Sequence, residues 1–205
     1  LEQLTQRDAL SPDTIPHSLP AIKFAVETAL IDFQREGPPT WLEGIPINGL
    51  VWMDNAEGVL KQVNVLIAKG YTTIKLKVGT LPFYEELELL KEIRRRCPSK
   101  DFTIRIDANG AFSNQTPDGL TALEKLQTLY NAGLDLHSIE QPIAPGLIEE
   151  MAELCAISPV PIALDEELIK VRSKSEKKVL LEKIRPAYLV LKPSLLGGFK
   201  ASEYW

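Results

Sequence analysis

The fold of this chain is decided by the stretch Tyr71–Gly79, YTTIKLKVG. Apolar and polar side chains alternate along it, and alternation with a period of two predicts a β-strand with one apolar face. The other face of the predicted strand carries two lysines, which is unusual for so short an apolar strand. The apolar face would consist of Ile74, Leu76 and Val78, and the polar face of Thr73, Lys75 and Lys77.

The two lysines, Lys75 and Lys77, leave two interpretations open. In a half-exposed sheet they would form a solvated face. Inside a barrel they would be two ammonium groups held close together, each of which lowers the pKa of the other. A lysine with a lowered pKa is suited to act as a base near neutral pH. The pattern of the rest of the chain is needed to choose between these interpretations.

Predicted strands and helices alternate along the chain. Such alternation with short connections predicts parallel strands joined by crossover helices. The lack of a Gly-rich nucleotide-binding fingerprint favours a (β/α) barrel over a doubly wound sheet. The predicted strands are 45–52, 71–78, 102–107, 135–142, 161–165 and 187–192. The predicted helices are 20–35, 56–69, 81–96, 116–131, 148–157 and 173–184, and a further short element opens at 197–198.

The length of the chain does not suit a complete barrel. A complete barrel has eight strands and about 250 residues, whereas this chain has 205 residues and does not begin with Met. An open barrel would leave two parallel strand edges without partners. We therefore expect an α/β fold, a barrel of about six strands truncated before the seventh and eighth, in a fragment of something longer.

Composition narrows the class of protein. The net charge is −5 and no basic patch is present, which argues against nucleic acid as a partner. No apolar run approaches the length of a membrane span. The two cysteines, Cys97 and Cys155, have no CxxC spacing and predict incidental thiols in a reducing cytoplasm. With only His17 and His137, a His-rich zinc site is not expected.

A charged residue stands near the end of each of five successive predicted strands. Consecutive members are 30, 33, 25 and 27 residues apart, which is one strand-helix unit each. The C-terminal strand ends of a parallel barrel form one rim, where active sites lie. The neighbouring apolar residues point the other way, so all five charged residues are predicted to face inward. They are Lys77, Asp107, Glu140, Asp165 and Lys192.

The three carboxylates among these residues predict a metal site. Asp107, Glu140 and Asp165 on adjacent strand ends would repel one another unless a positive charge lay between them. Oxygen ligation without His or Cys favours Mg²⁺ over Zn²⁺. Lys77 and Lys192 would flank the metal as an acid/base pair. This arrangement fits removal of a weakly acidic proton next to a carboxylate.

Each of these residues also has a structural alternative. An Asp after a strand can cap the next helix, and Asp107-Ala108-Asn109-Gly110 can be only a turn. Glu140 could be a loop residue, and Lys192 could be solvated. All five residues recur at the spacing of one strand-helix unit and are predicted to face inward. Separate structural explanations for each residue do not explain this shared pattern.

The order KxK, DANG, EQP, DE and KP on successive strands resembles the muconate-lactonizing subgroup of the enolase superfamily. The resemblance runs from about Pro20 onward. It implies a barrel over 41–205 and, in 1–40, the end of an N-terminal α+β capping domain. It implies Mg²⁺, for which Mn²⁺ can substitute, and a small carboxylate substrate, and it leaves the oligomeric state open. The implied roles are Lys75 and Lys77 for the KxK pair, Asp107, Glu140 and Asp165 for the metal ligands, Lys192 for the opposite face, and Asn109 near the metal.

Longer strings, above all KPSLLGG at 192–198, are most similar to a dehydratase branch of that subgroup. This branch acts in menaquinone biosynthesis. The similarity implies a syn dehydration in which Lys77 removes a proton and then protonates the departing hydroxyl. Lys192 would stabilise charge on the other side of the ring, and Lys75 would tune Lys77.

Several other functions remain open from the sequence. The nearest alternatives are a dipeptide epimerase, an N-acylamino acid racemase or a cycloisomerase of the same subgroup, with the lysines as a two-base pair. A Schiff-base aldolase would use Lys192 without a metal. A barrel that serves only as a binding or assembly module would use none of these residues chemically.

Overall fold

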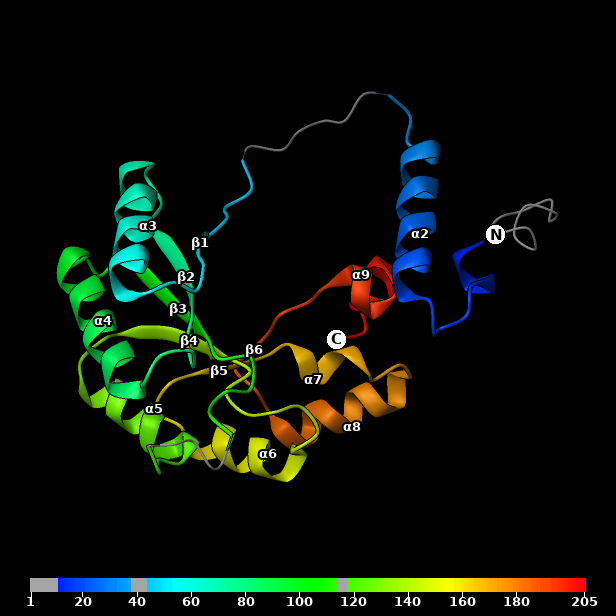
Figure 1. Cartoon of the computed structure of the whole chain (residues 1–205). Coiled ribbons are helices and arrows are strands. Elements are labelled where there is room, and N and C mark those ends of the chain that lie inside the picture. Colours follow the sequence, from blue (N-terminus) through cyan, green and yellow to red (C-terminus); the bar gives the residue numbers. More distant parts are fainter. Residues whose placement is uncertain (1–10, 38–43, 114–117) are drawn as a thin grey trace.

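The computed structural model describes residues 11–37, 44–113 and 118–205 and is built around one parallel sheet (Figure 1). The sheet has six strands in the order β1-β2-β3-β4-β5-β6, and each pair of neighbours is parallel. Strand order that follows the sequence is the arrangement expected of a (β/α) barrel, as predicted. The strands are β1 Gly49–Val51, β2 Thr73–Lys77, β3 Thr103–Asp107, β4 Leu136–Glu140, β5 Ile162–Leu164 and β6 Tyr188–Leu189.

Helices connect the strands and follow the outer side of the curved sheet (Figure 1). No helix among the described residues is both long enough and apolar enough to span a membrane. The crossover helices are α3 Ala56–Ala68, α4 Phe83–Arg96, α5 Ala122–Asn131, α6 Ile148–Ile157 and α8 Lys174–Ile184. The remaining helices are η1 Pro12–Thr14, α2 Pro20–Gln34, α7 Glu166–Ile169, α9 Pro193–Leu196 and α10 Phe199–Ser202.

The core lies between the sheet and this outer layer of helices. Alternate residues of β2 point into it, so Ile74 and Leu76 are buried while Lys75 and Lys77 are half-buried on the inner side of the sheet. The alternation predicted from the sequence is therefore confirmed. Burial of such aliphatic side chains typically stabilises the fold by about 1.5–3 kcal/mol each.

Three predicted elements differ from the structure by three or more residues at one end, and the others by no more than two. Two outer strands are shorter than predicted, at Gly49–Val51 and Tyr188–Leu189. The helix predicted over 116–131 is Ala122–Asn131, and residues 116 and 117 lie outside the described part. This helix begins after Thr121 because the Thr121 side chain and the Glu124 carboxylate cap each other's backbone N–H groups.

Helix α2 packs on α9 and α10 rather than on the sheet (Figure 1). The rings of Phe24 and Phe199 meet edge to face at 5.3 Å between centroids. The Glu27 carboxylate accepts hydrogen bonds from the backbone N–H groups of Phe199, at 2.5 Å, and Lys200, at 3.1 Å. These contacts join two parts of the chain that are far apart in sequence.

Candidate active site

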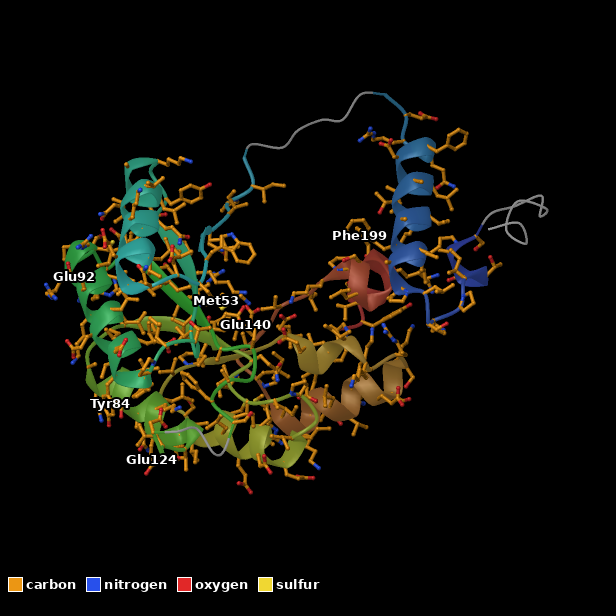
Figure 2. All side chains as sticks on the ribbon, viewed as in Figure 1. Met53, Tyr84, Glu92, Glu124, Glu140 and Phe199 are labelled. Carbon is orange, nitrogen blue, oxygen red and sulfur yellow. The ribbon has the colours of Figure 1, made fainter. Side chains whose placement is uncertain are left out.

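The inner side of the sheet carries the predicted charged residues. Strand register places Lys77 beside Asp107 and Asp107 beside Glu140, so the ends of β2, β3 and β4 form one level row. Lys75 lies one inward position earlier on β2. Figure 2 shows Glu140 inside the curve of the sheet, whereas Glu124 on α5 lies on the outer side.

Lysine and carboxylate groups pair closely in this row. Lys75 Nζ lies 2.6 Å from Glu140 Oε2 and 2.8 Å from Asp107 Oδ2. Lys77 Nζ lies 2.6 Å from the same Asp107 oxygen. Asp107 is fully buried and Glu140 is 6% exposed. Burying a charged carboxylate costs desolvation free energy unless a positive charge compensates it. The ion pairs with the lysines provide this compensation on the inner side of the sheet.

Asp165 and Lys192 form a second pair beside this row. Glu140 is level with Ala163 on β5, and Asp165 lies two positions further along. The Asp165 carboxylate is buried and contacts Lys192 Nζ. Among the described residues, no three His, Cys, Asp or Glu side chains are arranged to hold a metal ion as they stand. The carboxylates instead form ion pairs with the lysine ammonium groups.

Asn109 connects this row to the start of α7, the short helix that follows β5. Its side-chain oxygen accepts a hydrogen bond from Lys77 Nζ at 2.5 Å, and its amide group donates to Glu166 Oε1 at 2.8 Å. Its backbone N–H donates to Asp107 Oδ1 at 3.1 Å. The backbone φ of Asn109 is +43°, a left-handed conformation that Asn tolerates better than most residues. Asn109 therefore fixes the position of the Lys77 ammonium group.

Several buried carboxylate oxygens lack partners among the described residues. They include Glu140 Oε1 and Asp165 Oδ1, each on a side chain whose other oxygen contacts a lysine. A buried acceptor without a donor is costly. Hard oxygen atoms of this kind are the ligands that Mg²⁺ prefers. The donor set of the three carboxylates thus fits a hard divalent cation.

The carboxylates raise the pKa of Lys75, whereas the sequence predicted a lowered pKa. Burial lowers the pKa of Lys75, but its hydrogen bonds and ion pairs with Asp107 and Glu140 outweigh burial and hold that pKa above its usual range. The lowered pKa predicted for Lys75 is therefore wrong for this arrangement. The prediction rested on the nearby ammonium group alone, whereas two carboxylates reach Lys75 across the sheet.

The pKa of Glu140 moves in the opposite direction. Burial, aided by the negative charge of Asp107, raises the pKa of Glu140 to about 7 despite the contact with Lys75. The pKa of Asp107 is lowered because its hydrogen bonds to Lys75 and Lys77 outweigh its burial. The pKa values of these two neighbouring carboxyl groups therefore shift in opposite directions. The contacts with the two lysines determine which carboxyl group stays charged.

Glu140 should make the metal-free protein less stable as the pH rises. Below about pH 4.5 the carboxyl is protonated in both the unfolded and the folded state, and above about pH 7 folding must bury its charge. We expect the free energy of unfolding in EDTA to fall by about 1–3 kcal/mol between about pH 5 and pH 8, relative to Glu140→Gln. Urea unfolding of both proteins at the two pH values measures this difference. If the free energy of unfolding changed equally with pH in the two proteins, the raised pKa of Glu140 would be contradicted.

Gln141 is a residue of this site that the sequence did not single out. It is fully buried, and its side-chain oxygen accepts hydrogen bonds from the backbone N–H groups of Asp165, at 3.2 Å, and Glu167, at 3.3 Å. Its amide group donates to Ile143 O at 3.0 Å. Gln141 therefore ties the end of β4 to the end of β5. The EQP motif was the available signal, but it does not reveal the partners.

Replacing Gln141 by leucine should destabilise the protein. The change leaves two buried N–H groups and one buried carbonyl without partners, which costs about 1–3 kcal/mol or more. Thermal unfolding of Gln141→Leu in the presence of EDTA measures the loss. Gln127→Leu, on α5, is the control and should change stability far less. Equal losses in the two variants would show that the buried hydrogen bonds contribute little.

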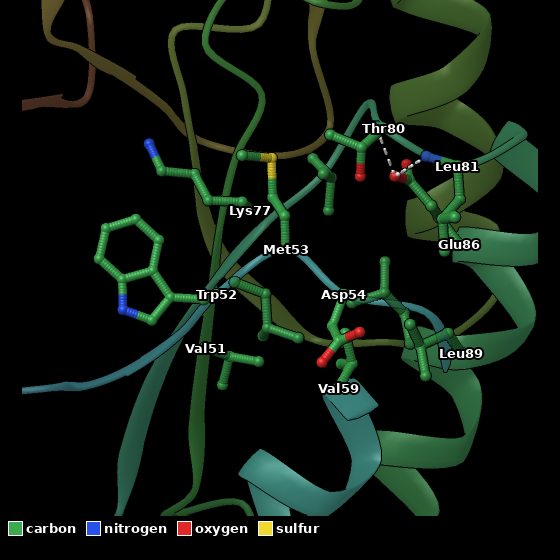
Figure 3. Close-up of a pocket in the computed structure, with 13 residues that line it drawn as sticks. Val51, Trp52, Met53, Asp54, Val59, Lys77, Thr80, Leu81, Glu86 and Leu89 are labelled. Carbon is green, nitrogen blue, oxygen red and sulfur yellow. Dashed lines mark hydrogen bonds between the residues drawn. The ribbon is translucent and has the colours of Figure 1, made fainter. Parts of the chain in front are cut away.

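A pocket lies beside Lys77, between the end of β1 and the loop before α4 (Figure 3). Trp52 and Met53, both largely exposed, stand on its β1 side. On the other side, the buried Glu86 carboxylate accepts hydrogen bonds from the backbone N–H groups of Thr80 and Leu81 at 3.0 and 3.1 Å. Glu86 thus fixes the loop that follows β2, and no sequence motif pointed to this role.

Comparison with known proteins identifies the class to which this fold and this arrangement belong. Residues 58–202 match the family described as enolase C-terminal domain-like, and the chain belongs to that family. The superfamily and the barrel-type fold predicted from the sequence motifs are thereby confirmed.

Individual relatives narrow the comparison. The chain is 43% identical over 195 residues to the o-succinylbenzoate synthase of Desulfotalea psychrophila, a match that covers 91% of this chain and 50% of that protein. It is 25% identical to the N-succinyl-L-Arg/Lys racemase of Bacillus cereus, over 88% of this chain and 52% of that protein. This chain spans about half the length of the curated relatives it matches.

A solved structure extends the similarity to the fold. The o-succinylbenzoate synthase of Thermosynechococcus elongatus BP-1, complexed with Mg in the active site, aligns with a TM-score of 0.77 at 28% identity. The alignment covers 98% of this chain and 59% of that one.

Proposed function

We propose that the complete protein carrying this chain is an o-succinylbenzoate synthase of menaquinone biosynthesis. The reaction is the syn dehydration of 2-succinyl-6-hydroxy-2,4-cyclohexadiene-1-carboxylate. The observation that carries the proposal is the set of paired lysines and carboxylates on adjacent strand ends. The 43% identity to an o-succinylbenzoate synthase supports this particular reaction. A cytoplasmic location, with Mg²⁺ as the cofactor and Mn²⁺ as its substitute, belongs to the same proposal.

Asp107, Glu140 and Asp165 would hold the metal ion. The buried, unpartnered oxygens of Glu140 and Asp165 support this assignment. Mg²⁺ bound there would supply the positive charge that stabilises negative charge developing on the substrate carboxylate. The same ion would compete with the lysines for the carboxylates, since Lys75 and Lys77 now share one Asp107 oxygen.

Lys77 is the proposed base and acid. Its neutral amine takes the proton α to the substrate carboxylate, and the resulting ammonium group returns that proton to the departing hydroxyl. A C–H bond and a C–O bond break, a C=C bond forms, and the ring becomes aromatic as water leaves. One group acting on one face makes the elimination syn. The hydrogen bond from Lys77 to Asn109 supports a fixed position for this nitrogen.

The other two lysines have supporting roles in this proposal. Lys192 approaches from β6, beyond Asp165, and would place its charge on the other side of the ring. Lys75 would help to hold the substrate carboxylate and tune Lys77. We also propose that residues 1–40 are the end of a capping domain and 41–205 the barrel domain. Residues 1–10, 38–43 and 114–117 of these two ranges lie outside the described residues.

Racemisation is the second candidate function. The similarity to an N-succinyl-L-Arg/Lys racemase favours it, at 25% identity. The same lysines would then exchange a proton on the two faces of one carbon. Dehydration is preferred because the higher identity belongs to the synthase.

Ultraviolet absorbance of the complete protein with the cyclohexadiene substrate tests the proposal. We expect rapid aromatisation with Mg²⁺ and loss of the reaction in EDTA. An N-succinyl amino acid in ²H₂O is the second substrate, and incorporation of ²H at its α-carbon reports racemisation. Exchange without aromatisation would replace the proposed function by the racemase. Neither reaction, in protein that binds Mg²⁺, would overturn both.

A further inference from the structure

A second pocket lies away from the candidate active site, where α2, the start of α8 and the turn between α9 and α10 meet. Its volume is about 380 Å³, within the range of small-molecule sites. Figure 2 marks Phe199 at the contact of α2 with the α9–α10 segment. None of the residues placed in the candidate active site lines it.

The wall of this pocket is strongly cationic in a chain whose net charge is −5. Asp13 is the one carboxylate among its described lining residues, and it lies 3.9 Å from one lysine and 3.4 Å from another. The positive charge on the wall therefore exceeds what the described carboxylate compensates. The cationic lining residues are Lys23, Arg172, Lys174, Lys177 and Lys200.

The most informative of these residues is Lys177. It is only 2% exposed, and within the described residues no carboxylate pairs with it. Its Nζ donates to Ala201 O at 2.6 Å and lies 4.9 Å from the centre of the Trp205 ring. Burial, aided by the nearby Arg172 charge, lowers the pKa of Lys177. A buried ammonium group without a counter-ion is unusual and favours an anion nearby.

Two more of these cations, Arg172 and Lys174, have no carboxylate partner among the described residues, whereas Lys23 and Lys200 share Asp13. Arg172 Nη1 donates to Leu195 O at 3.0 Å, which leaves most of its donors for another group. Lys174 Nζ lies 3.6 Å from the centre of the Tyr204 ring. Neither partner carries a negative charge. An anion could therefore accept charge-assisted hydrogen bonds from Arg172 and Lys174 without breaking an ion pair of either residue.

We propose that this pocket binds an anion with two linked phosphate groups, either free pyrophosphate or the diphosphate part of a nucleotide. A diphosphate carries more negative charge than a dicarboxylate, and it matches a wall with five cationic side chains and one carboxylate. The planar guanidinium of Arg172 suits two phosphate oxygens. This inference does not depend on the proposed function.

Calorimetry of the complete protein with inorganic pyrophosphate, in EDTA and at low salt, tests the proposal. We expect saturable binding that Arg172→Gln and Lys200→Gln each weaken about tenfold. Asp13→Asn should strengthen binding about threefold or more because it removes the one described carboxylate of the wall. Lys178→Gln, on the same helix but paired with Glu182 at 3.8 Å, should change binding less than about twofold.

Several outcomes would overturn this proposal. They are the absence of saturable binding, equal weakening by Lys178→Gln, weaker binding in Asp13→Asn, and sulfate competing as well as pyrophosphate. Loss of binding in Lys192→Gln would also overturn it, because the anion would then occupy the candidate active site. Titration with ADP as a second ligand distinguishes the two sources of the diphosphate, a nucleotide and free pyrophosphate. Much tighter binding of ADP points to a nucleotide, and equal binding points to pyrophosphate alone.

Discussion

Replacing Lys77 by alanine should lower the rate of aromatisation by about 10³-fold or more in the complete protein. The proposed mechanism gives this one amine both proton transfers, and loss of such a group typically costs about 10²–10⁴-fold for a single transfer. Mg²⁺ should bind at least as tightly as before, because the Lys77 ammonium group no longer occupies the Asp107 oxygen. Absorbance kinetics and calorimetry on the same protein measure the two effects separately.

The control for this prediction is Lys91→Ala. Lys91 lies on α4 and pairs with Glu88 at 2.7 Å, in a partly exposed position away from the inner face of the sheet. Its replacement should leave the rate unchanged within about twofold. If Lys77→Ala retained most of its activity, Lys77 would not be the base, and Lys192 would become the candidate.

Replacing Asp107 by asparagine should remove most of the metal affinity, by about 100-fold or more, and with it the activity. Asp107 is fully buried and is the carboxylate that both Lys75 and Lys77 contact. An amide oxygen carries no negative charge and therefore binds a divalent cation more weakly than a carboxylate oxygen does. Calorimetric titration with Mg²⁺ measures the change directly.

Asp101→Asn, an exposed change shortly before β3, is the matched control for Asp107→Asn. It should bind Mg²⁺ like the unmodified protein. Circular dichroism should establish that Asp107→Asn is folded, since the change also weakens the pairing of two half-buried lysines. The heat of binding should disappear when Glu140 and Asp165 are changed as well. If that heat survived in the triple variant, the three carboxylates would not be the metal site.

Elements with strong local signals could be predicted from the sequence. Helix α6 has the predicted bounds because apolar periodicity and Pro159 both define it. The start of α5 was misplaced because two threonines, at 116 and 121, are each acceptable caps by type. Only Thr121 is followed three residues later by a Glu that completes the capping box. Alternation along β2 gave its two faces correctly, since the period of a strand is fixed.

The candidate active site was only partly predictable, because its contacts join residues that are distant in sequence. Parity assigns Lys75, Asp107 and Glu140 to one face, but it cannot tell which lysine reaches which carboxylate. That choice depends on register, which places Lys77 beside Asp107 and lets Lys75 reach both carboxylates. Gln141 was missed because its side-chain oxygen binds backbone N–H groups at the start of α7, more than twenty residues away. Sequence patterns describe neighbours along the chain better than such long-range contacts.

The contact of α2 with α10 has a consequence for how the protein is made. Glu27 and Phe199 are 172 residues apart in sequence. At roughly 5–20 residues per second, a ribosome would synthesise them on the order of 10–30 s apart. Throughout that interval the newly made α2 lacks its contacts with α9 and α10, while the strands and helices between can already pair in order. Ribosome-bound chains halted before residue 199 should therefore protect the sheet from proteolysis before they protect α2.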